Sequence, residues 1–168
     1  STMKKANVTI LGATGAVGRE MLKVLEERNF PIGELRCLAS ARSVGKRLPF
    51  AGGELSVDEA TDAAFAGADI VLGAAENDIA RRFAPAIKAA GAVFIDNSSA
   101  FRLEPEVPLV VPEINPQDAL HHDGIIANPN CSTIITVVAV AGLCRLSPIL
   151  SMNAATYQAV SGAGAGGP

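Results

Sequence analysis

The sequence has no tryptophan, one tyrosine, three cysteines and no excess of basic residues. Its 14 lysines and arginines stand against 17 acidic residues, so the net charge is −3, which argues against a general binder of nucleic acids or membrane surfaces. Three cysteines without a CxxC pair argue against a disulfide framework and a zinc site, so we expect reduced thiols in the cytoplasm and no metal centre. Apolar runs stay shorter than the roughly 18 residues of a membrane span.

Apolar residues, in contrast, make up 49% of the 168 positions, enough for one domain with a sizeable core. We expect strands over residues 7–11, 34–40, 52–60, 68–75, 92–96, 109–113, 124–129 and 154–160, and helices over 16–28, 78–91 and 132–146. The strands alternate with helices and are mostly apolar throughout, which predicts a doubly wound α/β fold whose parallel sheet is covered on both faces. The helix over 132–146 is so apolar that we expect it to be largely buried.

A glycine-rich loop follows the first expected strand and opens the first helix. Gly12, Gly15 and Gly18 form the pattern G-x-x-G-x-x-G, a close variant of the dinucleotide-binding fingerprint. Glycine keeps the turn tight and lets the backbone approach a pyrophosphate, whose charge then faces the helix N-terminus. The loop therefore predicts a dinucleotide site, and a tight turn without a ligand is the alternative.

The end of the second expected strand indicates which dinucleotide is bound. An acidic residue for the ribose hydroxyls is typical of NAD-binding domains, but this chain has Ser40, Arg42 and Ser43 there. A guanidinium and two hydroxyls suit a 2′-phosphate, so we predict NADP rather than NAD. The alternative is that Arg42 is an arginine in a solvated surface loop.

Cys131 is the candidate nucleophile. It lies at the first turn of the expected helix, behind Asn128, Pro129 and Asn130, which are natural turn and cap residues. Amide groups at a helix N-terminus stabilise a thiolate, the form that would add to an aldehyde beside a nicotinamide. Spacing alone leaves a catalytic and a packing role open for Cys131, whereas we expect the other two cysteines, Cys37 and Cys144, to be buried and inert.

Six segments together resemble the aspartate-semialdehyde dehydrogenases, in order across nearly the whole chain: GATGAVG, LASARSVGK, DNSSAFR, LVVPEIN, ANPNCSTI and TYQAVSGAG. The resemblance implies a Rossmann-type NADP-binding domain over residues 1–130, followed over 131–168 by the start of a truncated catalytic and dimerisation domain. It implies reversible conversion of aspartyl phosphate to aspartate semialdehyde through a cysteine thioester, in lysine, threonine and methionine biosynthesis. A homodimer or homotetramer is expected of the full-length family members.

The resemblance also implies roles for individual residues. Cys131 matches the family's nucleophile, Gln158 the glutamine that orients substrate, Arg102 the phosphate-binding arginine and Asn130 an active-site asparagine. For the cofactor, it implies contacts by Thr14, Gly15, Ala16, Val17 and Gly18 with the pyrophosphate, and by Ser161 and Gly162 with the nicotinamide; we also expect contacts near Ser98 and Ser99. A surface position for Arg102 and a strand amide for Gln158 are the plainer alternatives.

Some features depart from the family pattern. Glu76 and Asp78 stand where relatives usually have small residues, and we expect Asn77 or Asp78 to cap the following helix. His121 and His122 match no family motif, and we expect them to be solvated.

Family members continue for about as long again, through a domain that carries the acid-base histidine, so the chain is expected to be a fragment of a dehydrogenase. The alternatives are a stand-alone NADP-binding module without turnover and an N-acetyl-glutamyl-phosphate reductase. The motif NPNCST argues against the second alternative, because those enzymes carry a glycine before the cysteine.

Overall fold

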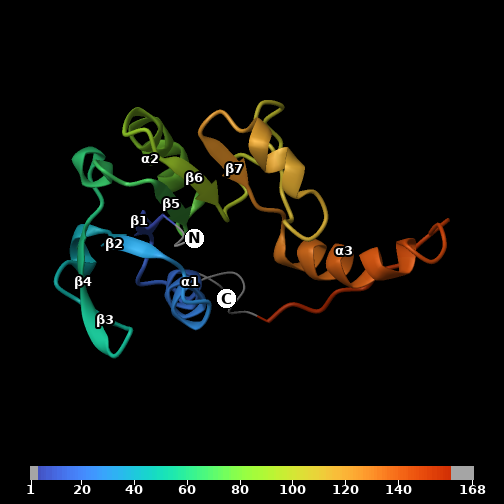
Figure 1. The fold of residues 1–168 in the computed structure, drawn as a ribbon, viewed down its shortest axis with the longest axis horizontal. Helices are drawn as coiled ribbons and strands as arrows, with labels where there is room; N and C mark the ends of the chain where they lie inside the picture. Colours follow the sequence, from blue (N-terminus) through green and yellow to red (C-terminus); the bar gives the residue numbers. More distant parts are fainter. Residues whose placement is uncertain (1–3, 160–168) are drawn as a thin grey trace.

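A seven-stranded sheet forms the centre of the computed structural model, which describes residues 4–159 (Figure 1). The strands are β1 (Ala6–Leu11), β2 (Ile32–Ala39), β3 (Arg47–Phe50), β4 (Gly53–Glu59), β5 (Ile70–Gly73), β6 (Val93–Asp96) and β7 (Ile125–Ala127). Their order is β3-β4-β2-β1-β5-β6-β7, and every neighbouring pair is parallel except β3 with β4. Apart from the antiparallel edge strand β3, this is the order of a doubly wound dinucleotide-binding sheet, which confirms the predicted fold class.

Helices cover the sheet on both faces because successive strand residues point to opposite sides. Helix α1 (Ala16–Glu27) packs its buried Leu22 into a core that also contains Ile10, Cys37, Leu48 and Val57. Helix α2 (Asn77–Ala89) contributes to the core of the other face, which contains Leu11, Leu38, Phe65, Val71, Phe83, Ile87 and Phe94. Short 3₁₀ helices span Ala41–Ser43, Asp62–Phe65 and Pro116–His121. The buried position of Cys37 is as predicted.

Two expected strands are wrong. The segment 109–113 makes only an isolated bridge between Leu109 and Ala127, while Val110 and Val111 are buried without forming a ladder. Pro108 precedes the segment and Pro112 lies within it, and a proline has no N–H to donate to a ladder. Residues 154–159 have no regular structure and are exposed, and residue 160 lies outside the described part.

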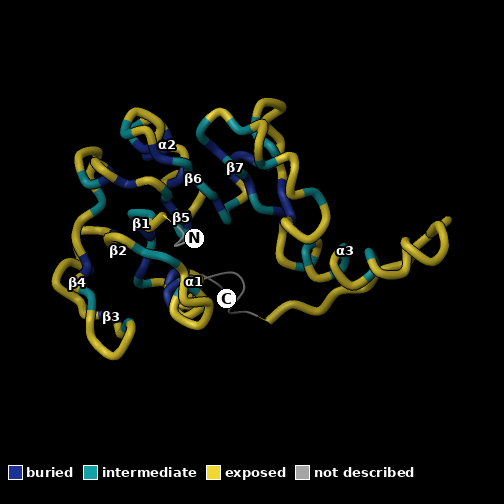
Figure 2. Tube along the Cα trace, viewed as in Figure 1, coloured by how far each residue is buried: buried dark blue, intermediate teal, exposed yellow. Residues whose placement is uncertain are grey.

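Helix α3 (Cys131–Cys144) forms where it was expected but is not buried. None of its residues is fully buried, and it extends away from the sheet (Figure 2). Ile135 is 70% exposed and Leu143 58%, and Cys144 is exposed as well, so the predictions of a largely buried helix and of a buried Cys144 are wrong for this structure. An apolar sequence shows that a helix requires burial, but it does not show which surface covers it.

Candidate active site

Five loops follow the carboxyl ends of the parallel strands and therefore lie at one edge of the sheet. They comprise residues 12–18 after β1, 40–43 after β2, 74–77 after β5, 97–102 after β6 and 128–131 after β7. Backbone hydrogen bonds join the first loop to its neighbours, since Gly12 N–H donates to Leu38 O at 2.9 Å and Ala74 N–H to Leu11 O at 2.8 Å. The strand order reverses between β1 and β5, and ligands of doubly wound sheets bind in the crevice outside that point.

The three glycines of the first loop have different tasks. Gly12 has a φ of +86°, and a Cβ there would lie 2.6 Å from Ala74 O. A Cβ on Gly18 would lie 2.7 Å from Ala13 Cα, so both positions need glycine for close backbone packing. Gly15 instead has ordinary dihedrals and no atom nearer than 3.6 Å to an added Cβ. Gly15 therefore borders open space, which a ligand could use.

The N-terminus of α1 suits an anion in that space. Gly15 is the N-cap residue, no side chain caps the helix, and its first turn contains no acidic residue. Ala16 and Val17 are exposed in this turn and Thr14 is half-buried beside it. Uncapped amides and the helix dipole favour a negatively charged group, so these residues fit the pyrophosphate of a dinucleotide.

Arg19 is a neighbour of this loop that the sequence reasoning missed. Its Nε donates to Thr14 O at 3.2 Å, which brings the guanidinium back over the glycine-rich loop. The signal available was its position directly after the third glycine, at the first turn of the helix.

The loop after β2 separates its three predicted residues. Ser40 and Arg42 are exposed, whereas Ser43 is buried and donates its N–H to Ser40 O at 2.8 Å. Leu38 O accepts hydrogen bonds from the backbone of the glycine-rich loop, so β2 adjoins that loop. Ser40 and Arg42 follow the end of β2 on the same side. These two side chains are therefore the accessible ones at the expected 2′-phosphate position.

The loop after β6 begins with a buried carboxyl group. Asp96 is fully buried and accepts hydrogen bonds from Ser98 Oγ at 2.6 Å and from Ser98 N–H at 3.1 Å. Burial raises the pKa of Asp96, and the hydrogen bonds of Ser98 and the charge of Arg102 oppose that rise. Ser98 thus faces the protein rather than the crevice.

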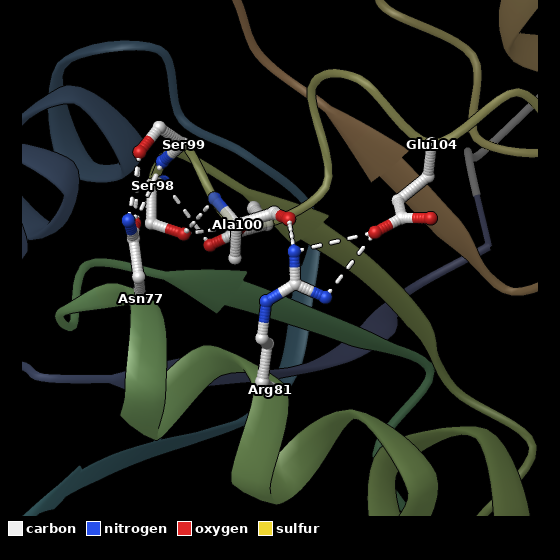
Figure 3. A network of polar contacts seen from close by, with 7 residues as sticks. Asn77, Arg81, Ser98, Ser99, Ala100 and Glu104 are labelled. Carbon is white, nitrogen blue, oxygen red and sulfur yellow. Dashed lines mark hydrogen bonds and ion pairs between the residues drawn. The ribbon is translucent and has the colours of Figure 1, made fainter.

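Helix α2 is tied to the same loop by two side chains (Figure 3). Asn77 accepts from Ser99 N–H at 2.9 Å and donates to Ser99 Oγ at 2.8 Å. Arg81 donates to the carbonyl of Ala100 and pairs with Glu104 at 3.2 Å. The loop that carries Ser98, Ser99 and Arg102 is therefore held to α2 by the side chains of Asn77 and Arg81.

Arg102 lies between two of the loops. It is half-buried, its Nε donates to Asn128 O at 2.7 Å, and its Nη2 donates to Asn97 O at 3.0 Å. The guanidinium therefore joins the loop after β6 to the loop that leads to Cys131. The sequence reasoning did not include this bridging contact.

Cys131 is exposed at the first position of α3. Asn130 is the N-cap residue, and its Oδ1 accepts from Ser132 N–H at 3.0 Å, as the sequence predicted. The thiol is thus located at the exposed start of α3, in the loop that follows β7 at the carboxyl edge of the sheet.

Other predicted residues have less defined positions. Gln158 is exposed, in a segment without regular structure and outside the hydrogen-bonded loops, while Ser161 and Gly162 lie outside the described residues.

The N-cap of α2 is Glu76, whose side chain makes no capping hydrogen bond, so the predicted cap at Asn77 or Asp78 is wrong. Asn77 binds Ser99 instead, and Asp78 accepts from the N–H of Ile79.

The two histidines lie at the far end of the 3₁₀ helix before β7. His121 is exposed, and His122 is half-buried and accepts from Gly124 N–H at 2.9 Å through Nδ1. Within residues 4–159, no three histidine, cysteine or acidic side chains lie close enough together to hold a metal ion. No helix in that range is long and apolar enough to cross a membrane.

Comparisons with known proteins identify relatives of the chain. It is 57% identical over 158 residues to an aspartate-semialdehyde dehydrogenase of Synechocystis sp., which covers 94% of this chain and 47% of that relative. The corresponding enzyme of Bacillus subtilis is 48% identical over 94% of this chain and 46% of its own length. A crystal structure of aspartate semialdehyde dehydrogenase II from Vibrio cholerae superimposes with a TM-score of 0.92, at 45% identity over 98% of this chain and 50% of that one.

The chain spans about half the length of the curated relatives it matches. Over residues 7–122 it also matches the family described as "Semialdehyde dehydrogenase, NAD binding domain". That range contains the glycine-rich loop, the loop after β2 and the loop with Arg102. The chain therefore belongs to the semialdehyde dehydrogenase family.

Proposed function

We propose that the complete protein is an NADP-dependent aspartate-semialdehyde dehydrogenase and that this chain supplies its cofactor site and its nucleophile. The observation that carries the proposal is the exposed Cys131 at the N-terminus of α3, on the same sheet edge as the uncapped N-terminus of α1. The relatives of the same name at 57% and 48% identity support the substrate class. A solved structure of the Vibrio cholerae enzyme in complex with ASA is 44% identical to this chain.

The proposed chemistry runs through the sulfur of Cys131. The thiolate adds to the carbonyl carbon of the semialdehyde, and the resulting oxyanion takes up a proton, giving a thiohemiacetal. NADP, when bound, supplies the hydride acceptor. Loss of hydride and of the hydroxyl proton leaves a thioester on Sγ, and attack by inorganic phosphate releases aspartyl phosphate and restores the thiolate. Asn130 holds the helix start that stabilises this leaving thiolate.

Arg102 is the proposed phosphate-binding residue. Two of its donor groups already bind backbone carbonyls, so the remaining face of the guanidinium would meet the phosphate oxygens. We propose Gln158 as a residue that orients the substrate, and Ser161 and Gly162 as contacts of the nicotinamide, on the family resemblance alone.

The choice of NADP over NAD is proposed from Arg42. Its exposed guanidinium and Ser40 stand beyond β2, where an acidic residue would otherwise select NAD. We expect Arg42→Ala to weaken NADP binding by about tenfold or more, the loss of one charged hydrogen bond, and to leave NAD binding nearly unchanged. Fluorescence titration with NADPH and NADH measures both, and an equal loss for the two cofactors would exclude this role.

Helix α3 is the proposed start of the second domain. Residues 1–130 would form the cofactor domain and 131–168 the first part of a catalytic and dimerisation domain, whose remainder would cover the apolar helix. We propose that the complete protein is a homodimer or homotetramer. All three cysteines are free thiols, which supports a reducing location such as the cytoplasm.

Phosphate-dependent formation of NADPH from aspartate semialdehyde tests the function directly. We expect turnover from the protein encoded by the complete gene, and none from its Cys131→Ala variant. Cys144→Ala is the matched control, because it removes a free thiol from the opposite end of the same helix. Turnover by Cys131→Ala would contradict the nucleophile assignment, and a preference for N-acetyl-glutamate semialdehyde would favour the neighbouring reductase.

A further inference from the structure

We infer that the side chains of Asn97 and Asn128 form a positioning pair for Cys131. Asn128 Nδ2 donates to Asn97 Oδ1 at 2.8 Å, across a sequence separation of 31 residues. Both residues are half-buried, and they belong to the loops that follow β6 and β7. Neither amide needs to touch substrate or cofactor for this role, which acts on the backbone that leads to the thiol.

The backbone of each partner is anchored independently of the side-chain pair. Asn97 N–H donates to Gly73 O at 3.1 Å, and Asn128 N–H donates to Asp96 O at 2.9 Å. Arg102 adds bonds to the carbonyl groups of both residues. The loops therefore keep their attachment to the sheet if either side chain is shortened, and the amide pair adds a lateral connection between them.

The position of Asn128 is passed on to Cys131 through a short, stiff segment. Pro129 is buried and has a fixed φ, and its ring also restricts the dihedral angles of Asn128. Asn130 then caps α3 by accepting from Ser132 N–H. A shift at Asn128 consequently moves the cap and the helix amides that surround the thiol. Since Cys131 is exposed, packing contacts around its own side chain hold it less than this segment does.

The inference rests on the proposed nucleophile, but it is tested by a property that requires no substrate. Alkylation by iodoacetamide, followed by mass mapping of each cysteine, reports the reactivity of Cys131 in the 168-residue chain, in which Cys144 is also exposed. Burial raises the pKa of Cys37 to about 11, which leaves Cys131 and Cys144 as the reacting thiols. Cys144 lies at the other end of α3 and serves as an internal standard in every sample.

We expect Asn97→Ala and Asn128→Ala each to slow the alkylation of Cys131 by about threefold to tenfold, the effect of one net hydrogen bond. Cys144 should react at the same rate throughout. The double variant should be no slower than the slower single variant, because either substitution already removes the shared bond. In the complete protein, kcat should fall by a similar factor while KM for the semialdehyde stays within about twofold.

Asn7→Ala is the matched control. Asn7 Oδ1 accepts from Glu34 N–H at 3.0 Å and its Nδ2 donates to Gly67 O at 3.0 Å, at the amino end of the sheet. The Asn7→Ala variant loses side-chain amide hydrogen bonds far from Cys131, so the reactivity of that thiol should not change. Unchanged or faster alkylation of Cys131 in both single variants would overturn the inference, as would losses that add in the double variant. Turnover by Cys131→Ala would defeat the proposed function and leave this reactivity result standing.

Discussion

At the scale of single residues, Asp96 combines complete burial with a role in holding the loop after β6. Because its pKa is raised by burial, the folded protein retains the proton at pH values where the unfolded chain has lost it. The free energy of unfolding should therefore fall as pH rises from the ordinary aspartate pKa of about 4 through the raised value. The buried carboxylate thus lowers stability at higher pH while it orders Ser98.

We expect Asp96→Asn to remove this part of the pH dependence. The difference in unfolding free energy between the variant and the parent should shift in favour of the variant as pH rises through that window. Ser98→Ala provides the opposite case, because it removes the hydroxyl hydrogen bond that lowers the pKa of Asp96, so the stability of this variant should fall more steeply with pH. Urea unfolding between pH 4 and 8 measures all three proteins, and parallel curves would show that folding does not raise the pKa of Asp96.

The glycines of the first loop allow folding and ligand binding to be separated. Gly18→Ala should destabilise the chain by about 1–3 kcal/mol, because its Cβ would overlap the backbone of Ala13. Gly15→Ala should change stability by less than about 0.5 kcal/mol, since its Cβ meets open space. That same Cβ would enter the expected pyrophosphate position, so NADPH binding should weaken by about tenfold or more. Thermal melts and NADPH titrations check this, and full affinity in Gly15→Ala would place the ligand elsewhere.

At the scale of elements, Arg81 connects helix α2 to the loop that carries Arg102 (Figure 3). Its guanidinium lies 5.3 Å from the centroid of the Phe101 ring, in addition to its bonds with Ala100 and Glu104. The adjacent Arg82 has a similar cation–π contact with Phe83 and an exposed pair with Asp62, but no backbone carbonyl partner among the described residues. The two neighbouring arginines thus differ mainly in the carbonyl bond.

We expect Arg81→Ala to cost about 1–2 kcal/mol, more than Arg82→Ala, because only the first leaves a partly buried carbonyl without its donor. The exposed ion pairs of both should contribute about 1 kcal/mol or less. Denaturant unfolding of the two variants, with Arg81→Lys as an intermediate case, measures the difference. Equal losses would show that the carbonyl bond adds nothing to the stability of this loop.

Strong local patterns made most elements predictable. The central strands are continuous apolar runs, and the glycine-rich loop has a strand before it and a helix behind it, so their types and order follow from the sequence. Cys131 and its cap Asn130 were found for the same reason, since capping is a local interaction. The Asn97–Asn128 pair was missed, because a side-chain contact between two loops leaves no local pattern.

Strand β3 was also missed, and its turn explains why. Phe50 pairs with Gly53, and the two turn residues between them, Ala51 and Gly52, have φ values of +49° and +76°. Such turns usually carry Asn-Gly or Asp-Gly, and alanine with positive φ is not a turn signal. Strand β3 is therefore specified by its pairing with β4 rather than by a turn signal in the sequence.

At the scale of the whole molecule, α3 differs from the sheet and from the other two α-helices in how little of it is buried. The sheet and helices α1 and α2 enclose their own core, whereas α3 is apolar on all sides and alternates between exposed and half-buried residues, with none buried (Figure 2). A helix with this composition is typical of a buried position. Together with relatives about twice as long, this supports the proposal that further chain packs around α3 in the complete protein.

Ile135 offers a direct test of that proposal, since it is 70% exposed in this structure. In the complete protein, Ile135→Ala should cost about 2–4 kcal/mol, as truncation of a buried isoleucine does. In the 168-residue chain the same substitution should change the free energy of unfolding by less than about 0.5 kcal/mol. Leu103→Ala, in a loop of the sheet domain where the side chain is 96% exposed, should have little effect in either protein. If Ile135→Ala is also neutral in the complete protein, α3 remains uncovered there, and the start of a second domain at residue 131 must be abandoned.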